Sequence, residues 1–290
     1  MTNTRPPATY NHVDENPIPP AKPAHNRVIL PPMTDAYTFA IQLARESGQL
    51  LLEYYTNPNT QSRLKADHTI ITEADLAADQ HITNAIRAQF PDDHILSEEH
   101  NTTYVDTATP TWVIDPLDGT ANFSLGVHYW GVSIARVVNG WPEIGVLYFP
   151  YINELYTAQR GGGVQLNGTP LRVSPPKHPI SFFICDSRLH RRYDARIRYK
   201  CRILGSAAYN FCAIARGASI AGFESTPKIW DIAASWLVLQ EAGGAIHPYE
   251  GAPFPMVAGK NYEGTSYPVL GAINAETLTQ MRQKITPKQT

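Results

Sequence analysis

Apolar side chains recur at helical spacing in two segments of the N-terminal half. From Thr34 to about Tyr55 they share one face of a helix, and a second such segment runs from Thr72 to Pro91. Thr72-Glu73-Ala74-Asp75 has the order of a variant capping box, in which two polar side chains bind the free amides of a helix start. The pattern therefore predicts two amphipathic helices, and Asp75 is expected to cap the second.

Short apolar runs separated by turn residues follow these helices. Asn139-Gly140 and Asn167-Gly168 are typical of tight hairpin turns. The strands that flank these turns are expected at residues 132–138, 144–148 and 171–173. This half of the chain should therefore form an antiparallel sheet.

Beyond about residue 175 the pattern changes to strands that alternate with helices. Strands are predicted at 181–185, 201–204 and 268–273, and helices from Ser206, from Trp230 and after the capping residue Asn274. Such alternation favours a mixed sheet. The fold class is thus α+β, with one domain over residues 34–286 and halves at about 34–175 and 176–286.

Residues 1–33 contain many prolines and few apolar side chains. A segment of this composition buries too little surface to offset its ordering entropy, so we expect a disordered tail. Its longest apolar run, Val28-Ile29-Leu30, is too short for a signal peptide or a membrane span. The acids Asp14 and Glu15 also weaken the case for an organelle transit peptide.

The composition indicates a small-molecule ligand and a reducing compartment. Lysine and arginine together number 24 against 26 acids, so no global charge attracts nucleic acid or a membrane surface. Cys185, Cys201 and Cys212 have neither the spacing of a zinc site nor the even number of a disulfide framework. Reduced thiols in a cytoplasmic protein are the simplest interpretation.

The sequence Trp112-Val113-Ile114-Asp115-Pro116-Leu117-Asp118-Gly119-Thr120 carries the clearest chemical signal. A buried strand that ends in closely spaced carboxylates offers hard oxygen ligands to a divalent cation. Gly119 permits a tight turn and offers its amide to an anion. The segment therefore predicts a metal ion and a phosphate bound side by side.

Two distant segments supply further acids. The short strand that starts at His94 ends in Glu98-Glu99, and Asp231 lies at the start of the Trp230 helix. Oxygen ligands without histidine or cysteine favour Mg2+ over zinc. Together with the Asp115–Phe123 motif, these segments closely resemble the inositol monophosphatase family of phosphatases, and the resemblance extends from about Asp35 to Ile285.

The resemblance implies a layered αβαβα sandwich and two or three Mg2+ ions in each active site. One ion would be held by Glu98, Asp115 and the Leu117 carbonyl, and a second by Asp115, Asp118 and Asp231. In this scheme Glu99 is outside the ligand set, either behind it or in solvent. The role of Asp75 changes from helix cap to catalysis, because the family pairs this aspartate with the threonine at Thr120 to orient a metal-activated water.

The resemblance also assigns the phosphate and substrate contacts. The Gly119 and Thr120 amides would bind the phosphate, whereas Ser206, Ala207 and Glu224 would bind the alcohol part of the substrate. One departure concerns Ile220, because the family usually has an aspartate at this position. That difference affects substrate identity and leaves the metal chemistry unchanged.

The function that follows is Mg2+-dependent hydrolysis of a small phosphate monoester, with inositol 1-phosphate or a similar polyol phosphate preferred. Fructose 1,6-bisphosphate, histidinol phosphate and 3'-phosphoadenosine 5'-phosphate remain alternatives, as does a metal-binding protein without turnover. The basic residues between Arg188 and Lys200 are interpreted as a solvated face or subunit contact, or as a grip on a second phosphate. The resemblance further implies a homodimer.

Overall fold

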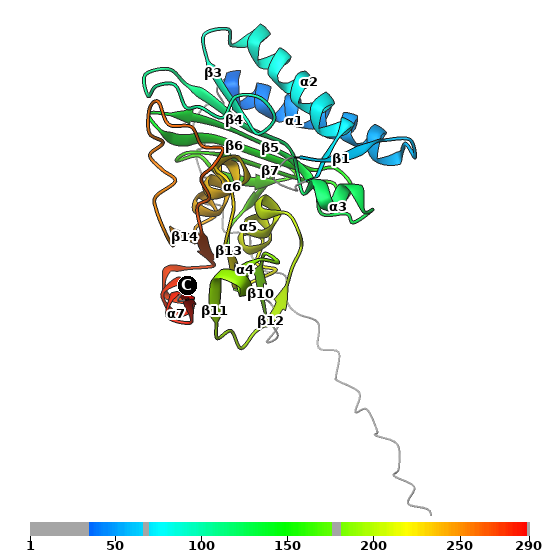
Figure 1. Cartoon of the computed structure of the whole chain (residues 1–290). Coiled ribbons are helices and arrows are strands. Elements are labelled where there is room, and N and C mark those ends of the chain that lie inside the picture. The colour runs from blue at the N-terminus through cyan, green and yellow to red at the C-terminus, as the bar shows by residue number, and fades with distance from the viewer. Residues whose placement is uncertain (1–34, 66–69, 176–180, 289–290) are drawn as a thin grey trace, which may run out of the picture. The chain divides into compact units, whose positions relative to one another are not determined.

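A seven-stranded sheet forms the centre of the N-terminal half (Figure 1). The structure is a computed structural model that describes residues 35–65, 70–175 and 181–288. The strand order is β3-β4-β5-β6-β7-β8-β9, in which β3 and β4 are parallel and all other neighbours are antiparallel. The strands are β3 (His94–Ser97), β4 (Thr111–Asp118), β5 (Gly131–Val138), β6 (Trp141–Phe149), β7 (Glu154–Gln159), β8 (Gly163–Leu166) and β9 (Thr169–Leu171).

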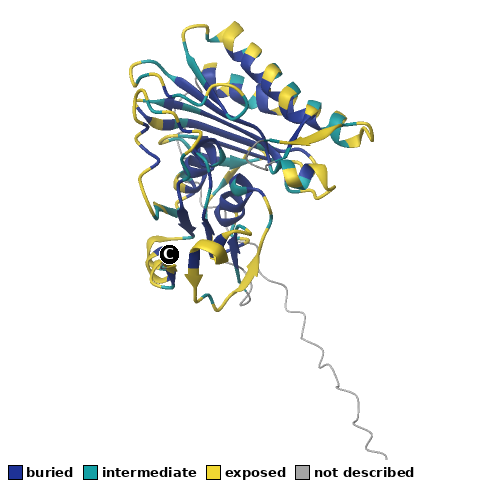
Figure 2. Cartoon of the chain, in the orientation of Figure 1, coloured by how far each residue is buried: buried dark blue, intermediate teal, exposed yellow. Residues whose placement is uncertain are grey.

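The two predicted amphipathic helices, α1 (Asp35–Thr56) and α2 (Glu73–Gln89), cover one face of this sheet. Their apolar stripes are buried against the sheet, with Ala40 and Ile82 inaccessible to solvent, while their outer faces are exposed (Figure 2). The helices α5 (Ala207–Ala215) and α6 (Ile229–Glu241) lie on the opposite face. There α6 approaches so closely that a Cβ at Gly145 would lie 2.8 Å from the Ala234 carbonyl oxygen.

The C-terminal half contains a five-stranded mixed sheet, as expected. Its order is β12-β10-β13-β15-β14, with the first three strands parallel and the last two pairings antiparallel. The strands are β10 (Phe182–Cys185), β12 (Lys200–Arg202), β13 (Ala221–Glu224), β14 (Ala245–Pro248) and β15 (Val269–Ala272). Helix α7 (Ala275–Arg282) packs against this sheet through Leu278 and Met281, which completes the αβαβα layering.

The remaining elements are short. They are the pair β1 (Ser62–Leu64) and β2 (Ile70–Thr72), the pair β11 (Tyr193–Ala195) and β16 (Ile285–Pro287), and the helices α3 (Thr120–Ser124) and α4 (Leu189–Arg192). Over the described residues, none of the helices combines the length and apolar character that a bilayer span requires. The predicted disordered tail falls outside the described residues.

The hairpin turns lie where the sequence predicts them. Asn139 and Asn167 both adopt a positive φ, and each is followed by a glycine that does the same. The strand expected at 171–173 instead spans Thr169–Leu171, because the Asn167-Gly168 turn joins β8 directly to β9. The second helix ends at Gln89 rather than Pro91, since the residue before a proline is disfavoured in helical conformation.

Candidate active site

A β-bulge at the end of β4 directs two carboxylates towards the same cavity. Asp115 pairs with Ser133 and Asp118 with Gly131, so three steps along β4 match two along β5. Pro116, which has no N–H to give to the ladder, lies within this bulge. Both Asp115 and Asp118 line a cavity of about 520 Å3, whereas perfect alternation would place residues three apart on opposite faces.

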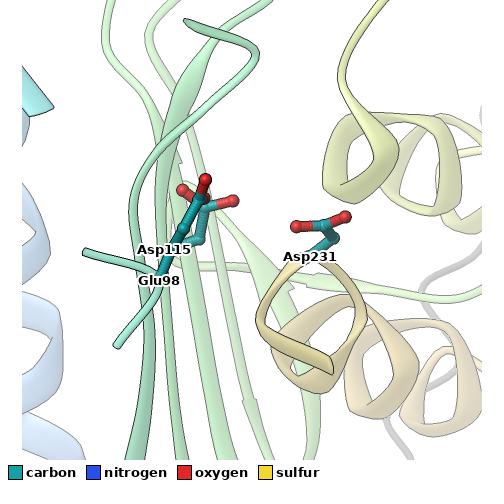
Figure 3. A group of neighbouring side chains, drawn as sticks. All are labelled: Glu98, Asp115 and Asp231. Atoms are coloured by element: carbon teal, nitrogen blue, oxygen red, sulfur yellow. The ribbon is translucent and has the colours of Figure 1, made fainter. Parts of the chain in front are cut away.

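Glu98, Asp115 and Asp231 converge from three different elements (Figure 3). The parallel pairing of Ser97 with Ile114 sets Glu98 beside Asp115, and Asp231 faces them from the first turn of α6. One carboxylate oxygen from each lies within 4.8 Å of the other two. With Asp118, which lines the same cavity, these residues form what we call the acid cluster.

The charge of the acid cluster suits a divalent cation. Loss of hydration and repulsion by neighbouring acids raise the pKa of Asp115 and Asp231 well above the usual range, and burial raises that of Asp118 to about 7. Lys65 lies 2.9 Å from Glu98 and 2.7 Å from Glu99, and it is the one described basic side chain that forms an ion pair with the cluster. The four carboxylates and the Lys65 ammonium together give the site an excess of negative charge, which a bound Mg2+ ion would neutralise.

Glu99 does not join the cavity but contacts Lys65, and its side chain is only 4% exposed. Of its two predicted positions, behind the ligand set or in solvent, the structure shows the first. Burial raises its pKa to about 7. Glu99 thus helps to hold the Lys65 amine beside Glu98.

Asp75 and Thr120 are in direct contact, as their predicted pairing requires. Thr120 Oγ1 lies 2.9 Å from Asp75 Oδ1 and 2.9 Å from the Leu117 carbonyl oxygen. The other carboxylate oxygen of Asp75 accepts the Thr72 N–H at 2.7 Å in a capping box at the start of α2. The carboxylate therefore caps a helix and binds Thr120 at the same time, and burial raises its pKa to about 6.

Ser206 and Ala207 hold Asp118 from the opposite side of the cavity. Ser206 caps α5 by accepting the Tyr209 N–H at 3.1 Å, and its hydroxyl donates to Asp118. The Ala207 and Ala208 amides also donate to this carboxylate, so Asp118 lies at the positive end of the α5 dipole. Ser206 and Ala207, predicted to bind substrate, thus line the cavity and orient a carboxylate as well.

The cavity lining from the C-terminal half includes three polar residues that we call the C-terminal wall: Asp186, Asn210 and Glu224. Glu224 is the last residue of β13, and the pairing of Cys185 with Phe223 sets Asp186 beside it. Asn210 Nδ2 donates to Glu224 from α5. Asp186 accepts the Arg188 N–H at 2.7 Å and the Ser225 N–H.

Only Glu224 of this wall was predicted from the sequence. Asp186 directly follows the strand predicted at 181–185, but only the pairing of β10 with β13 brings it to Glu224. Asn210 is the one amide side chain in the otherwise apolar helix α5, and the packing of that helix brings it to Glu224. Neither residue lies in a recognisable motif.

The sequence profile described as the Inositol monophosphatase family matches residues 33–286. The chain belongs to this family. It is similar to the Nus factor SuhB of Pasteurella multocida, with 33% identity over 78% of this chain and 90% of that protein. It is also similar to the histidinol-phosphatase of Chlorobaculum parvum, with 32% identity over 76% and 88% of the two chains. Among solved structures it resembles the extragenic suppressor protein suhB from Bartonella henselae, with a TM-score of 0.75, 26% identity, and coverage of 87% and 98%.

Asn122, which belongs to the Asp115–Phe123 motif, has a structural role. Its amide donates at 2.7 Å to the carbonyls of both Tyr129 and Leu204, so it ties α3 to the loop that leads into α5. In that loop Gly205 has a φ of 79°, and a Cβ there would lie 2.6 Å from Asn122 Oδ1. Asn122 and Gly205 thus join the segments that carry Asp118 and Ser206.

Asp79 supports the segment that carries Glu98. It is fully buried in α2 and contacts both the Ser97 hydroxyl and His100 Nδ1. These two partners flank the Glu98-Glu99 pair in sequence. Asp79 lies four residues after Asp75, so both acids are on the same face of α2. This spacing is the signal by which the sequence could have indicated Asp79.

Ile220 and most of the basic stretch lie away from the cavity. Ile220 packs in an apolar cluster with Phe223, so the departure from the family pattern does not change a cavity side chain. Of the stretch from Arg188 to Lys200, only Arg188 lines the cavity among the described residues, and its guanidinium lies 3.2 Å from the Thr226 hydroxyl. The other arginines of the stretch are exposed, which agrees with the interpretation of a solvated face.

Proposed function

We propose that this protein hydrolyses the phosphate monoester of a small polar alcohol in an Mg2+-dependent reaction. The acid cluster is the observation that carries the proposal, because it gathers the carboxylates of Glu98, Asp115, Asp118 and Asp231 on one cavity. Members of the family are phosphatases and are in general Mg2+-dependent. Both the donor atoms and the family therefore support the same reaction class.

The acid cluster and the Leu117 carbonyl are the groups that would hold the metal ions. Bound Mg2+ would neutralise the phosphoryl oxygens, lower the pKa of the attacking water and stabilise the leaving alkoxide. We assign two or three ions to the site, with Asp115 shared between two of them, on the family pattern. Asp118 is pre-oriented for this role by Ser206 and the α5 amides.

Thr120 and Asp75 position the water and accept its proton. The Thr120 hydroxyl lines the cavity, and the Asp75 carboxylate lies directly behind it in hydrogen-bond contact. Burial raises the pKa of Asp75 to about 6, closer to neutrality, where a proton acceptor is most effective. The Gly119 and Thr120 amides, at a turn with a left-handed glycine, are assigned to the phosphate oxygens.

The substrate's alcohol part should carry hydrogen-bond donors. Glu224 lines the cavity, and its buried carboxylate accepts one hydrogen bond from Asn210 and can accept more from a ligand. Polyols such as inositol and amino alcohols such as histidinol both meet this requirement. The same cavity also leaves fructose 1,6-bisphosphate and 3'-phosphoadenosine 5'-phosphate as candidates, for which Arg188 would provide the second anion contact.

Phosphate release tests the proposal. Purified protein would be assayed with and without Mg2+ on inositol 1-phosphate, fructose 1,6-bisphosphate, histidinol phosphate and 3'-phosphoadenosine 5'-phosphate, and Asp231→Asn would serve as the blank. We expect Mg2+-dependent release from at least one ester and none above background in the blank. A folded protein that binds Mg2+ but releases no phosphate from these esters or from an aryl phosphate would instead support a metal-binding protein without turnover.

The proposal also includes a homodimer and a cytoplasmic location. The family resemblance supports the first, and the three free cysteines support the second. Size-exclusion chromatography with light scattering checks the first: a mass near twice 32.2 kDa is expected, and a mass equal to one chain would contradict it.

A further inference from the structure

Two of the three cysteines lie on adjacent strands and on the same face of the C-terminal sheet. Phe183 of β10 pairs with Cys201 of β12 in parallel register, so Cys185, two residues further along β10, shares the face of Cys201 (Figure 1). Both cysteines line a second cavity of about 350 Å3. Cys185 is 5% exposed, Cys201 is exposed, and the two thiols are in hydrogen-bond contact. A buried thiol thus contacts an exposed one.

The surroundings of the two sulfurs give them different roles in an oxidation. Burial, followed by repulsion from Cys201, raises the pKa of Cys185 to about 12, so this group is a protonated thiol at neutral pH. Cys201 is open to solvent. An oxidant therefore reaches Cys201 first, and Cys185 is positioned to react with the oxidised product. The third cysteine, Cys212, is inaccessible in α5 and does not line the second cavity.

We propose that Cys201 is a site of oxidation by peroxide and that Cys185 converts the product into a reversible disulfide. The Cys201 thiolate attacks one oxygen of hydrogen peroxide, the O–O bond breaks, and a sulfenic acid and hydroxide form. The hydroxide takes up the proton that the thiol released and becomes water. The Cys185 sulfur then attacks the Cys201 sulfur, the S–O bond breaks, and the proton of Cys185 leaves with the hydroxyl group as a second water.

In sum, two thiols and one peroxide give one disulfide and two waters, and an external thiol reverses the reaction. The contact between the sulfurs makes the second step intramolecular, which offsets the low acidity of Cys185.

Closure of this bond requires the two strands to move. Strands about 4.8 Å apart that rise about 3.3 Å per residue place diagonal Cα atoms about 8 Å from each other, whereas a disulfide spans at most about 6.8 Å. Strand β12 is the more mobile partner, because it is a three-residue edge strand, exposed throughout and paired with β10 alone. The disulfide should therefore displace β12 along β10.

The segment that follows β12 connects this displacement to the acid cluster. The Leu204 carbonyl accepts the Asn122 amide at 2.7 Å, and Ser206 donates to Asp118. Ile203, which precedes these residues, lines both cavities. A displaced β12 would weaken the contacts that orient Asp118, so the oxidised protein should bind Mg2+ about fivefold less tightly or worse, the effect of one lost hydrogen bond. This coupling rests on the proposed function, whereas the disulfide does not.

Peptide mapping tests the disulfide. Protein treated with hydrogen peroxide should yield a peptide in which Cys185 is linked to Cys201, and a thiol reductant should remove the link. Cys185→Ser should instead keep a sulfenic acid at Cys201 that dimedone captures. Cys212→Ser is the matched control and should form the same link as the wild-type protein. Absence of the linked peptide, or a link between the Cys201 residues of two chains, would overturn the inference.

Calorimetry of Mg2+ binding tests the coupling without assuming turnover. Peroxide should weaken Mg2+ binding by the wild-type protein and by Cys212→Ser, and a thiol should restore it. Cys201→Ser, a change at an exposed residue, should bind Mg2+ equally before and after peroxide. An equal loss in Cys201→Ser, or unchanged affinity in the linked protein, would overturn the coupling. Reduced protein that binds Mg2+ but hydrolyses no ester would contradict only the proposed function.

Discussion

The acid cluster and the C-terminal wall line the same cavity but are built in different ways. Three acids of the cluster lie in or directly after strands β3 and β4, which are adjacent in the sheet and close in sequence. The wall takes one residue each from the end of β10, from α5 and from the end of β13. The first arrangement can be written as a short motif, whereas the second depends on how distant segments pair. We infer that the reaction resides in the first region and the choice of alcohol in the second.

The largest effect should come from Asp115, which the scheme shares between two metal ions. Asp115→Asn removes a charge from the centre of the cluster, and we expect kcat to fall by about 10³-fold or more. Thermal stability should not fall, since the loss relieves repulsion among buried acids. Asp92→Asn, at an exposed acid, is the matched control and should be silent in kinetics and melting. Appreciable turnover by folded Asp115→Asn would remove the cluster from the mechanism.

Next in size is the Thr120–Asp75 contact. Thr120→Val keeps the volume but removes the hydroxyl that lies 2.9 Å from Asp75, so kcat should fall by about 10²-fold. Thr120→Ser retains the hydroxyl and should stay within about threefold of wild type. If steady-state kinetics show the same loss in both variants, packing rather than the hydroxyl is the cause, and the assigned role is wrong.

The C-terminal wall should affect substrate choice alone. Glu224→Ala should raise KM for the preferred ester about 10-fold and leave kcat/KM for an aryl phosphate nearly unchanged, because the aryl group lacks the donors that Glu224 binds. Glu224→Gln keeps an acceptor for Asn210 and controls for the buried amide that the alanine variant leaves unpaired. Equal losses on both substrates would mean that the two regions are not separable.

The smallest effect is the pH dependence of the stabilisation by Mg2+. Burial raises the pKa of Asp118 from 3.8 to about 7. Between these pH values the metal-free folded protein holds a proton that the unfolded chain has released, so the free energy of unfolding falls as pH rises towards 7. Mg2+ binds the deprotonated carboxylates. The increase in melting temperature caused by Mg2+ should therefore be larger at pH 8 than at pH 6, by a few degrees in scanning fluorimetry, and smaller at both pH values in Asp231→Asn. An increase that is equal at the two pH values would contradict this linkage.

The elements of the fold could be predicted where a local sequence pattern marks them and not where such a pattern is absent. Helices α1 and α2 were predicted because their apolar positions follow the helical period, and the β5–β6 hairpin because Asn139-Gly140 favours its turn. Strand β13 was not located, because it is central, buried on both faces and includes Ala221 and Gly222, so it shows no alternation.

The acids of the cluster could be named because each lies at a strand end or in the first turn of a helix, within a recognisable motif. Asp186 and Asn210 could not, because only the pairing of β10 with β13 and the packing of α5 bring them to Glu224. The Ser206 contact to Asp118 was also missed, although a helix was predicted to begin at Ser206. Residues that act through long-range pairing carry no local signal.

The most direct test of the division between the two regions is phosphate release from p-nitrophenyl phosphate, a substrate that cannot use the C-terminal wall. The wild-type protein should hydrolyse it only with Mg2+, and Asp186→Asn should do so at a similar rate. Asp231→Asn, which lacks an acid of the cluster, should show almost no activity. Release without Mg2+, or equal rates in Asp231→Asn and wild type, would contradict the claim that the acid cluster performs the reaction.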